Sequence, residues 1–272
     1  MSDLKIEELI PGGILIVEKP SGITSHDVID QVRSKYGTMA VGHAGTLDPF
    51  ATGELIILLN EYTKYSNTFL TLSKTYSFEA ILGKKTLSGD LEDKVIAENT
   101  DIKFDKELFE SKIKDQLDKY LKEYYQVVPI LSSIKVAGFK LRELTRNSNN
   151  PKVVKRKELN TPDNEILVQT DSKESITSES DIGVFDLKRG IKYILLPKRK
   201  VDIVSYSNLI LSLNEKENIV MSGDIKVSSG TYIRKLVEDI TENSLNIYSY
   251  LSKLSRTYDR DLILKAISNI KT

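Results

Sequence analysis

Short apolar runs that alternate with amphipathic stretches are the feature that most restricts the fold of this chain. The runs GILIVE (residues 13–18) and ELIILLN (54–60) are continuous, whereas KTYSFEAILG (74–83) alternates apolar and more polar side chains. Both patterns are typical of strands. Residues 105–125 carry apolar side chains at helical spacing. Strands and helices mixed along one chain predict an α/β or α+β fold.

Local signals also bound individual elements. Thr24 or Ser25 can cap a helix that ends at Gly37. Two alternating runs at 200–213 and 219–233 predict a pair of strands.

The domain organisation follows from a change in composition. Residues 148–199 are largely polar and irregular, which predicts an insertion, much of it a mobile loop. The segment RKLVEDITENSL (234–245) predicts a helix beyond the insertion. We expect one catalytic domain over residues 1–262, interrupted by this insertion, and a short C-terminal tail over residues 263–272.

Composition excludes several classes of chemistry. With no cysteine, the chain has no disulfide, thiolate nucleophile or cysteine-ligated zinc. Its two histidines give little scope for a histidine-rich metal site, so a reaction without metal or cofactor is the simplest expectation. Lys plus Arg and Asp plus Glu both number 39, so any nucleic-acid surface must be local. No signal segment or membrane span is recognisable, which predicts a cytoplasmic protein with no membrane partner.

The densest group of chemically useful residues lies in the loop GHAGTLDPFATG (42–53). Its glycines allow the backbone to approach a ligand closely, and Asp48 supplies a carboxylate. On the residues alone, a cap for a helix starting at Pro49 is the favoured role of Asp48.

This loop resembles the signature GHxGTLDPxATGxL of the bacterial TruB family of tRNA pseudouridine synthases. Four further segments resemble the same family in the same order: VEKPSGITSHDVI (17–29), KTYSFEAILG (74–83), VPILSSIKVAGFKLREL (128–144) and SSGTYIRKL (228–236). The resemblance implies a monomeric enzyme that isomerises uridine 55 in the TψC stem-loop of tRNA without a cofactor. It also implies a mixed, largely antiparallel sheet flanked by helices, here without a C-terminal PUA domain.

The resemblance also implies three catalytic residues. Asp48 attacks the target nucleoside, Arg234 pairs with that carboxylate, and Tyr76 stacks on the target base. The alternative interpretation of Arg234 is an exposed arginine without a catalytic role. The alternative interpretation of Tyr76 is a tyrosine that packs in the core.

A second group is implied to bind substrate RNA. Its members are His43, Gly42, Thr46, Lys19, Lys135, Lys140 and Arg142. His43 matches the histidine that assists base flipping, and a structural role is its alternative. Lys135, Lys140 and Arg142 begin a basic stretch that extends to residue 157, for which a solvated charged face is the alternative.

Two segments depart from the family pattern, and other functions stay open. Residues 128–133 lack one proline and an aromatic residue, and Ser229 stands where the family has lysine. A guide-dependent synthase of the dyskerin type shares the catalytic loop, but the expected absence of a PUA domain argues against it. A tRNA-folding chaperone, or an RNA-binding protein in which catalysis is secondary, is an alternative from another class.

Overall fold

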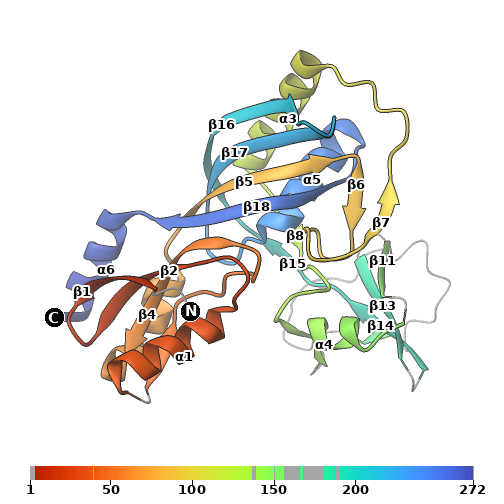
Figure 1. Cartoon of the computed structure of the whole chain (residues 1–272). Helices are drawn as coiled ribbons and strands as arrows, with labels where there is room; N and C mark the ends of the chain where they lie inside the picture. The colour runs from red at the N-terminus through yellow and green to blue at the C-terminus, as the bar shows by residue number, and fades with distance from the viewer. Residues whose placement is uncertain are drawn as a thin grey trace.

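The computed structural model describes residues 4–38, 40–136, 139–149, 151–155, 166–167, 181–187 and 190–271. Its largest sheet has eight strands. In order across the sheet they are β1 (Lys5–Ile10), β2 (Ile14–Lys19), β4 (Thr52–Leu59), β18 (Ser249–Tyr258), β5 (Lys74–Leu82), β17 (Ile219–Val227) and β16 (Ile203–Leu213), with β3 (Val41–His43) paired to β4. Strands β4 and β18 run parallel, and the other neighbours are antiparallel. The predicted mixed, largely antiparallel sheet is confirmed (Figure 1).

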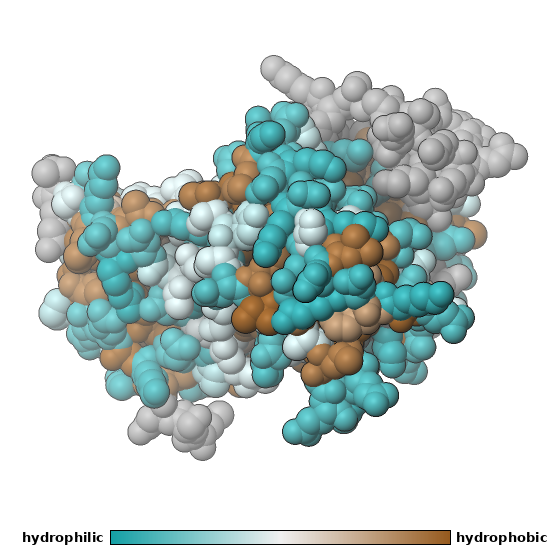
Figure 2. Space-filling view, turned by 90° about the horizontal axis from the view of Figure 1, so that it is seen from above, coloured by the Kyte–Doolittle hydropathy of each residue, from teal (hydrophilic) through white to brown (hydrophobic). Residues whose placement is uncertain are grey.

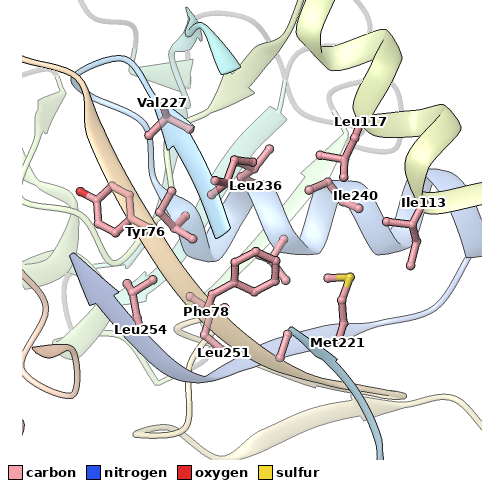
Figure 3. Close-up of a cluster of buried hydrophobic side chains, with 14 of the residues drawn as sticks. Tyr76, Phe78, Ile113, Leu117, Met221, Val227, Leu236, Ile240, Leu251 and Leu254 are labelled. Atoms are coloured by element: carbon pink, nitrogen blue, oxygen red, sulfur yellow. The ribbon is translucent and has the colours of Figure 1, made fainter. Parts of the chain in front are cut away.

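Strand β5 shows how the alternating sequence forms a half-buried strand. Tyr76 and Phe78 are buried in the main core, whereas the intervening Ser77 is exposed. The core lies between the sheet and two predicted helices, α3 (Lys106–Lys122) and α5 (Ile233–Leu245), as Figure 3 shows. One face of β5 therefore packs on helices while the other stays accessible.

The continuous apolar runs have a different explanation, because β2 and β4 are covered on both faces. Helix α1 (Ser25–Tyr36) covers one face, and helix α6 (Arg260–Lys271) covers the other. In β2, Leu15 packs toward α1 while Ile14 packs toward α6. The expected C-terminal tail over 263–272 is therefore wrong for its described part, because Ile263, Ala266 and Ile267 are buried in this core.

The predicted bounds of α1 are confirmed in detail. The side chain of Thr24 accepts a hydrogen bond from the Asp27 main-chain nitrogen, and the Asp27 carboxylate accepts one from the Thr24 nitrogen. This capping box satisfies two otherwise unpaired donors. Gly37 ends the helix in the left-handed conformation, with φ of 61°.

The polar insertion contains more regular structure than its composition predicts. Strands β11 (Lys152–Lys155), β13 (Asp181–Leu187), β14 (Gly190–Leu195) and β12 (Ile166–Leu167) form a second sheet in that order. This sheet packs with α4 (Leu141–Arg146) around Phe185 and Ile194, which lie in two mainly apolar runs within the insertion. Residues 156–165 and 168–180, where the mobile loop is expected, lie outside the described residues.

The remaining elements are short. They are η1 (Asn60–Tyr65), α2 (Ser66–Leu70), β6 (Lys84–Thr86), β7 (Val95–Glu98), β8 (Tyr125–Val127), β9 (Lys135–Val136), β10 (Phe139–Lys140) and β15 (Lys198–Lys200). Strand β15 pairs with β8 and so connects the end of the insertion to the segment that follows α3.

The surface is mainly hydrophilic in the view from above, with apolar side chains interspersed (Figure 2). Within the described ranges, no helix has both the length and the apolar character needed to cross a bilayer.

Candidate active site

Asp48 lies in the loop between β3 and β4, at the start of a turn. The main-chain nitrogen of Ala51 donates to the carbonyl of Asp48 over 3.1 Å, and no helix begins at Pro49. The interpretation of Asp48 as a helix cap is therefore wrong. Its carboxylate is free to serve another purpose.

Arg234, in the first turn of α5, pairs with Asp48. Its Nε donates to Asp48 Oδ2 over 2.9 Å, and its Nη2 reaches Asp48 Oδ1 at 3.4 Å. The Arg234 side chain is 7% exposed, while that of Asp48 is 35% exposed. The arginine is thus fixed inside the protein, and the carboxylate meets the surface of a cavity. The interpretation of Arg234 as an exposed residue is wrong.

Other groups fix the guanidinium of Arg234 in this orientation. Nη1 donates to the carbonyl of Ser88, and Nη2 lies 3.5 Å from the carbonyl of Leu131. Asp90 lies 3.7 Å from Nε and is itself buried. Burial alone would lower the pKa of Arg234, but the carboxylates of Asp48 and Asp90 outweigh it and raise that pKa. A permanent positive charge therefore faces Asp48.

Buried polar residues fix the backbone of the Asp48 loop. Lys19 is fully buried, and its ammonium donates to the carbonyls of Pro20, Ile23 and Pro49 at 2.8 to 3.0 Å. Ser25 exchanges two hydrogen bonds with the main chain of Leu47. The expected contact between Lys19 and RNA is therefore wrong for this conformation, since all three ammonium protons point to main-chain carbonyls.

Arg256, on β18, fixes the other side of the loop. It is 1% exposed and donates to the carbonyls of Gly45, Thr46 and Glu54. Gly53 allows the main chain of β4 to lie close to that of β18 at Arg256, because a Cβ there would lie only 2.2 Å from the Arg256 carbonyl oxygen.

A cavity of about 500 Å³ opens beside Asp48 and Arg234. Tyr76 lines it as well as belonging to the main core, so the two interpretations of this residue are compatible. In Figure 3 the Tyr76 ring lies at the end of the core cluster. Of the other loop residues predicted to bind RNA, Thr46 lines the cavity.

His43 and Gly42 lie on β3, outside the residues that line the cavity. His43 Nδ1 is buried with no hydrogen-bond partner among the described residues. Burial, with smaller effects from Arg256 and His26, lowers the pKa of His43, so its imidazole is neutral at pH 7. The structure does not bring His43 to the carboxylate.

The basic residues Lys135, Lys140 and Arg142 do not line the cavity. Lys140 pairs with Glu143 over 2.8 Å, and Arg142 donates to Ser133 Oγ over 3.1 Å. Ser133 does line the cavity, and Lys135 is exposed. This arrangement is compatible with contacts to a long polyanion outside the cavity.

Three residues of the site, Lys74, Gln126 and Arg199, were not predicted from the sequence. Lys74 and Arg199 line the cavity, and burial together with the charge of Arg256 lowers the pKa of Lys74 to about 8. Gln126 is buried, accepts from the Tyr232 nitrogen over 2.8 Å and donates to its carbonyl over 2.9 Å. Lys74 is the first residue of the segment KTYSFEAILG, and this position is the one feature of the sequence that could have indicated a role in the site. An isolated Gln or Arg gives no such indication.

No three His, Asp or Glu side chains of the described part of the chain come together to hold a metal ion. The arrangement instead offers an anchored carboxylate, an aromatic ring and several cations around one cavity. Such a set suits covalent catalysis by a carboxylate on an anionic substrate that carries a planar base.

Comparison with known proteins agrees with this chemistry. A family model described as "TruB family pseudouridylate synthase (N terminal domain)" matches residues 33–185. The chain is 34% identical over 245 residues to the tRNA pseudouridine synthase B of Acholeplasma laidlawii, covering 90% of this chain and 68% of that relative. It is 32% identical over 246 residues to the protein of the same name from Aquifex aeolicus, covering 90% and 67%.

A solved structure shares the fold. The "Crystal Structure of a Cbf5-Nop10-Gar1 Complex" contains a chain that matches with a TM-score of 0.50 at 18% identity. The match covers 90% of this chain and 48% of the other, so this chain spans about half of that protein's length.

The class of protein that the fold, the site and these matches define is the pseudouridylate synthases. Within this class the chain belongs to the TruB family, since the family model covers more than half of it and includes Asp48 and Tyr76.

Proposed function

We propose that this chain is a tRNA pseudouridine synthase that isomerises uridine 55 in the TψC stem-loop, with Asp48 as its catalytic carboxylate. The pairing of Asp48 with the buried Arg234 at the wall of the cavity is the observation that carries the proposal. The names of the relatives support tRNA as the substrate.

The geometry suggests how each residue acts. Arg234 orients Asp48 through its guanidinium, and the exposed part of the carboxylate attacks the nucleoside. The bond from the ribose to the base nitrogen breaks, the base rotates, and a bond from the ribose to a base carbon forms as the carboxylate is released. That carbon then loses its proton to solvent, and the freed base nitrogen gains a proton from solvent. The product is an isomer of the substrate, so the reaction consumes no redox equivalent or other reactant.

Tyr76 has the position required to retain the detached base. Its ring lines the same cavity as Asp48, and an aromatic face can stack on a base that has left the RNA helix. The ring is also fixed by the main core, so little side-chain freedom is lost on binding.

The proposal extends to the setting of the enzyme. We expect residues 1–262, with the insertion at 148–199, to include the catalytic machinery, and a monomer to act on cytoplasmic tRNA. Sedimentation of the chain alone and with one equivalent of tRNA tests the stoichiometry.

The function itself is tested by mapping pseudouridine in unmodified tRNA transcripts. The native chain is compared with Asp48→Asn at equal RNA occupancy. We expect modification at position 55 with the native chain and none with the variant. Tight binding without any product from the native chain would contradict the proposal and favour an RNA-folding role.

A further inference from the structure

The active cavity carries more positive than negative side chains. Its charged lining residues are Asp48, Lys74, Arg199, Arg234 and Arg256. Arg234 pairs with Asp48, Arg256 donates to three main-chain carbonyls, and Lys74 donates to two. These three cations therefore already have acceptors inside the protein.

Arg199 differs from them. Its side chain is exposed, and among the described residues its guanidinium has no hydrogen-bond acceptor and no carboxylate within ion-pair distance. A cation of this kind retains its full capacity to bind an anion that enters the cavity.

The backbone around Arg199 is nevertheless firmly placed. Arg199 is the register partner of Gln126 in the β8–β15 pair. Three residues later, the Asp202 nitrogen donates to Ser228 Oγ over 2.8 Å, and the Ser228 nitrogen donates to the Asp202 carbonyl over 2.9 Å. Both connections join the Arg199 strand to the segment that leads into α5 and Arg234.

The guanidinium lies over the turn that precedes α5. Arg199 Nη1 is 3.9 Å from the position that a Cβ on Gly230 would take, and it is the nearest atom to that position from outside residues 229–231. Gly230 has φ of +85°, a conformation that favours glycine, so no side chain occupies this space. The turn sequence Ser228–Ser229–Gly230 contains no cation of its own.

We propose that Arg199 binds a phosphodiester of the RNA backbone adjacent to the target nucleotide. This rests on the proposed function, because a uridine that enters the cavity as part of RNA brings its flanking phosphates with it. The planar guanidinium presents paired donors that match two phosphate oxygens. Arg199 thereby makes the last strand of the insertion a part of the substrate site.

Arg199→Gln tests the proposal, with Lys200→Gln as the matched control. Adjacent strand residues point to opposite faces, and Lys200 is exposed, does not line the cavity and lies 3.6 Å from Glu123. Both variants lose one charge from β15. The measurements are kcat and KM for unmodified tRNA, and the slope of log affinity against log salt for RNA binding.

With Arg199→Gln we expect KM to rise roughly tenfold, kcat to change less than about twofold, and the salt slope to fall by about one. Lys200→Gln should match the native chain, and Arg199→Lys should lie between the two. Equal KM and slope for both glutamine variants would overturn the proposal, as would a fall in kcat with unchanged KM.

Failure of the underlying function gives a separate result, because the native chain itself would then form no pseudouridine. If Arg199→Gln does not fold, as judged by circular dichroism, the comparison of Arg199→Lys with the native chain still decides the proposal. An unchanged KM for that variant would then contradict the paired-donor contact.

Discussion

Arg234 Nε donates a hydrogen bond to Asp48 Oδ2 over 2.9 Å, although the two residues lie 186 positions apart in the chain. The same guanidinium also donates to the Ser88 carbonyl and reaches that of Leu131. A lysine ammonium is a single point charge and cannot reproduce this planar arrangement.

Arg234→Lys should therefore reduce kcat roughly 100-fold, since the carboxylate loses its orientation while a positive charge remains. We also expect a loss of about 1–3 kcal/mol in the free energy of unfolding, because buried acceptors lose their donors. Single-turnover kinetics and urea denaturation measure the two effects. Arg33→Lys, on α1 and paired with Asp30, is the control and should leave kcat unchanged. Native-like kcat for Arg234→Lys would show that charge alone suffices.

Tyr76 provides a second test, because its ring and its hydroxyl can be separated. No hydrogen bond involves its hydroxyl within the part of the chain that the structure describes. Tyr76→Phe should then keep kcat/KM within a few-fold. Tyr76→Leu should lose about 1–3 kcal/mol of transition-state binding through the missing stacking contact.

Phe78 is the matched control for Tyr76, since it lies two residues along the same buried face of β5 but does not line the active cavity. Phe78→Leu should lower stability while leaving the kcat/KM of the folded protein unchanged. If Tyr76→Leu affects only stability in the same way, the stacking role is refuted.

Gln126 is predicted to position Arg234 through the main chain. Its amide makes a donor and an acceptor contact with Tyr232, two residues before the arginine. Gln126→Glu retains the acceptor but loses the donor and buries a charge, so we expect a lower kcat and roughly 2–4 kcal/mol lower stability at pH 8.

The pH dependence distinguishes this positioning role from a general loss of packing. Burial raises the pKa of a glutamate at this site, and its protonated form can donate to the Tyr232 carbonyl again. The kcat of Gln126→Glu relative to native should therefore recover as pH falls toward 5.5, whereas that of Gln126→Leu should not. Parallel pH profiles for the two variants would exclude the positioning role.

Local sequence patterns predict much of this fold. The capping residues of α1, the alternation in β5 and the pair β16–β17 each depend on residues within a few positions of one another, and the structure contains all three. Helix α6 also has a readable pattern, with apolar residues at 263, 266 and 267, but its position near the chain end favoured a tail.

The candidate site is less accessible to such reasoning. The resemblance identified Asp48, Arg234 and Tyr76, and all three meet at the cavity. Arg256 and Gln126 act on main-chain atoms of segments far away in sequence, so neither periodicity nor spacing reveals them. Lys19 was also identified as a site residue, but its ammonium donates to main-chain carbonyls inside the protein. Only its burial in the structure reveals this role.

Two buried lysines predict an unusual pH dependence of stability. Burial lowers the pKa of Lys19 and of Lys74 to about 8, whereas an unfolded lysine titrates near 10.4. Between these values the unfolded chain binds more protons than the folded protein, so stability rises with pH. We expect the free energy of unfolding to increase by about 1–2 kcal/mol per pH unit between pH 8.5 and 9.5.

Buried tyrosines set the upper limit of this window. Burial raises the pKa of Tyr258 to about 12, and burial with the charge of Asp239 raises that of Tyr124. Unfolded tyrosine ionises near pH 10, so above about pH 10 the unfolded chain binds fewer protons at these residues than the folded protein does. The free energy of unfolding therefore decreases there. Urea denaturation at half-unit steps from pH 7 to 10.5 should show a maximum near pH 10. Lys74→Met should flatten the rise while Lys200→Gln leaves it intact; a steady decline in stability above pH 8 in the native chain would mean that both lysines stay charged when buried.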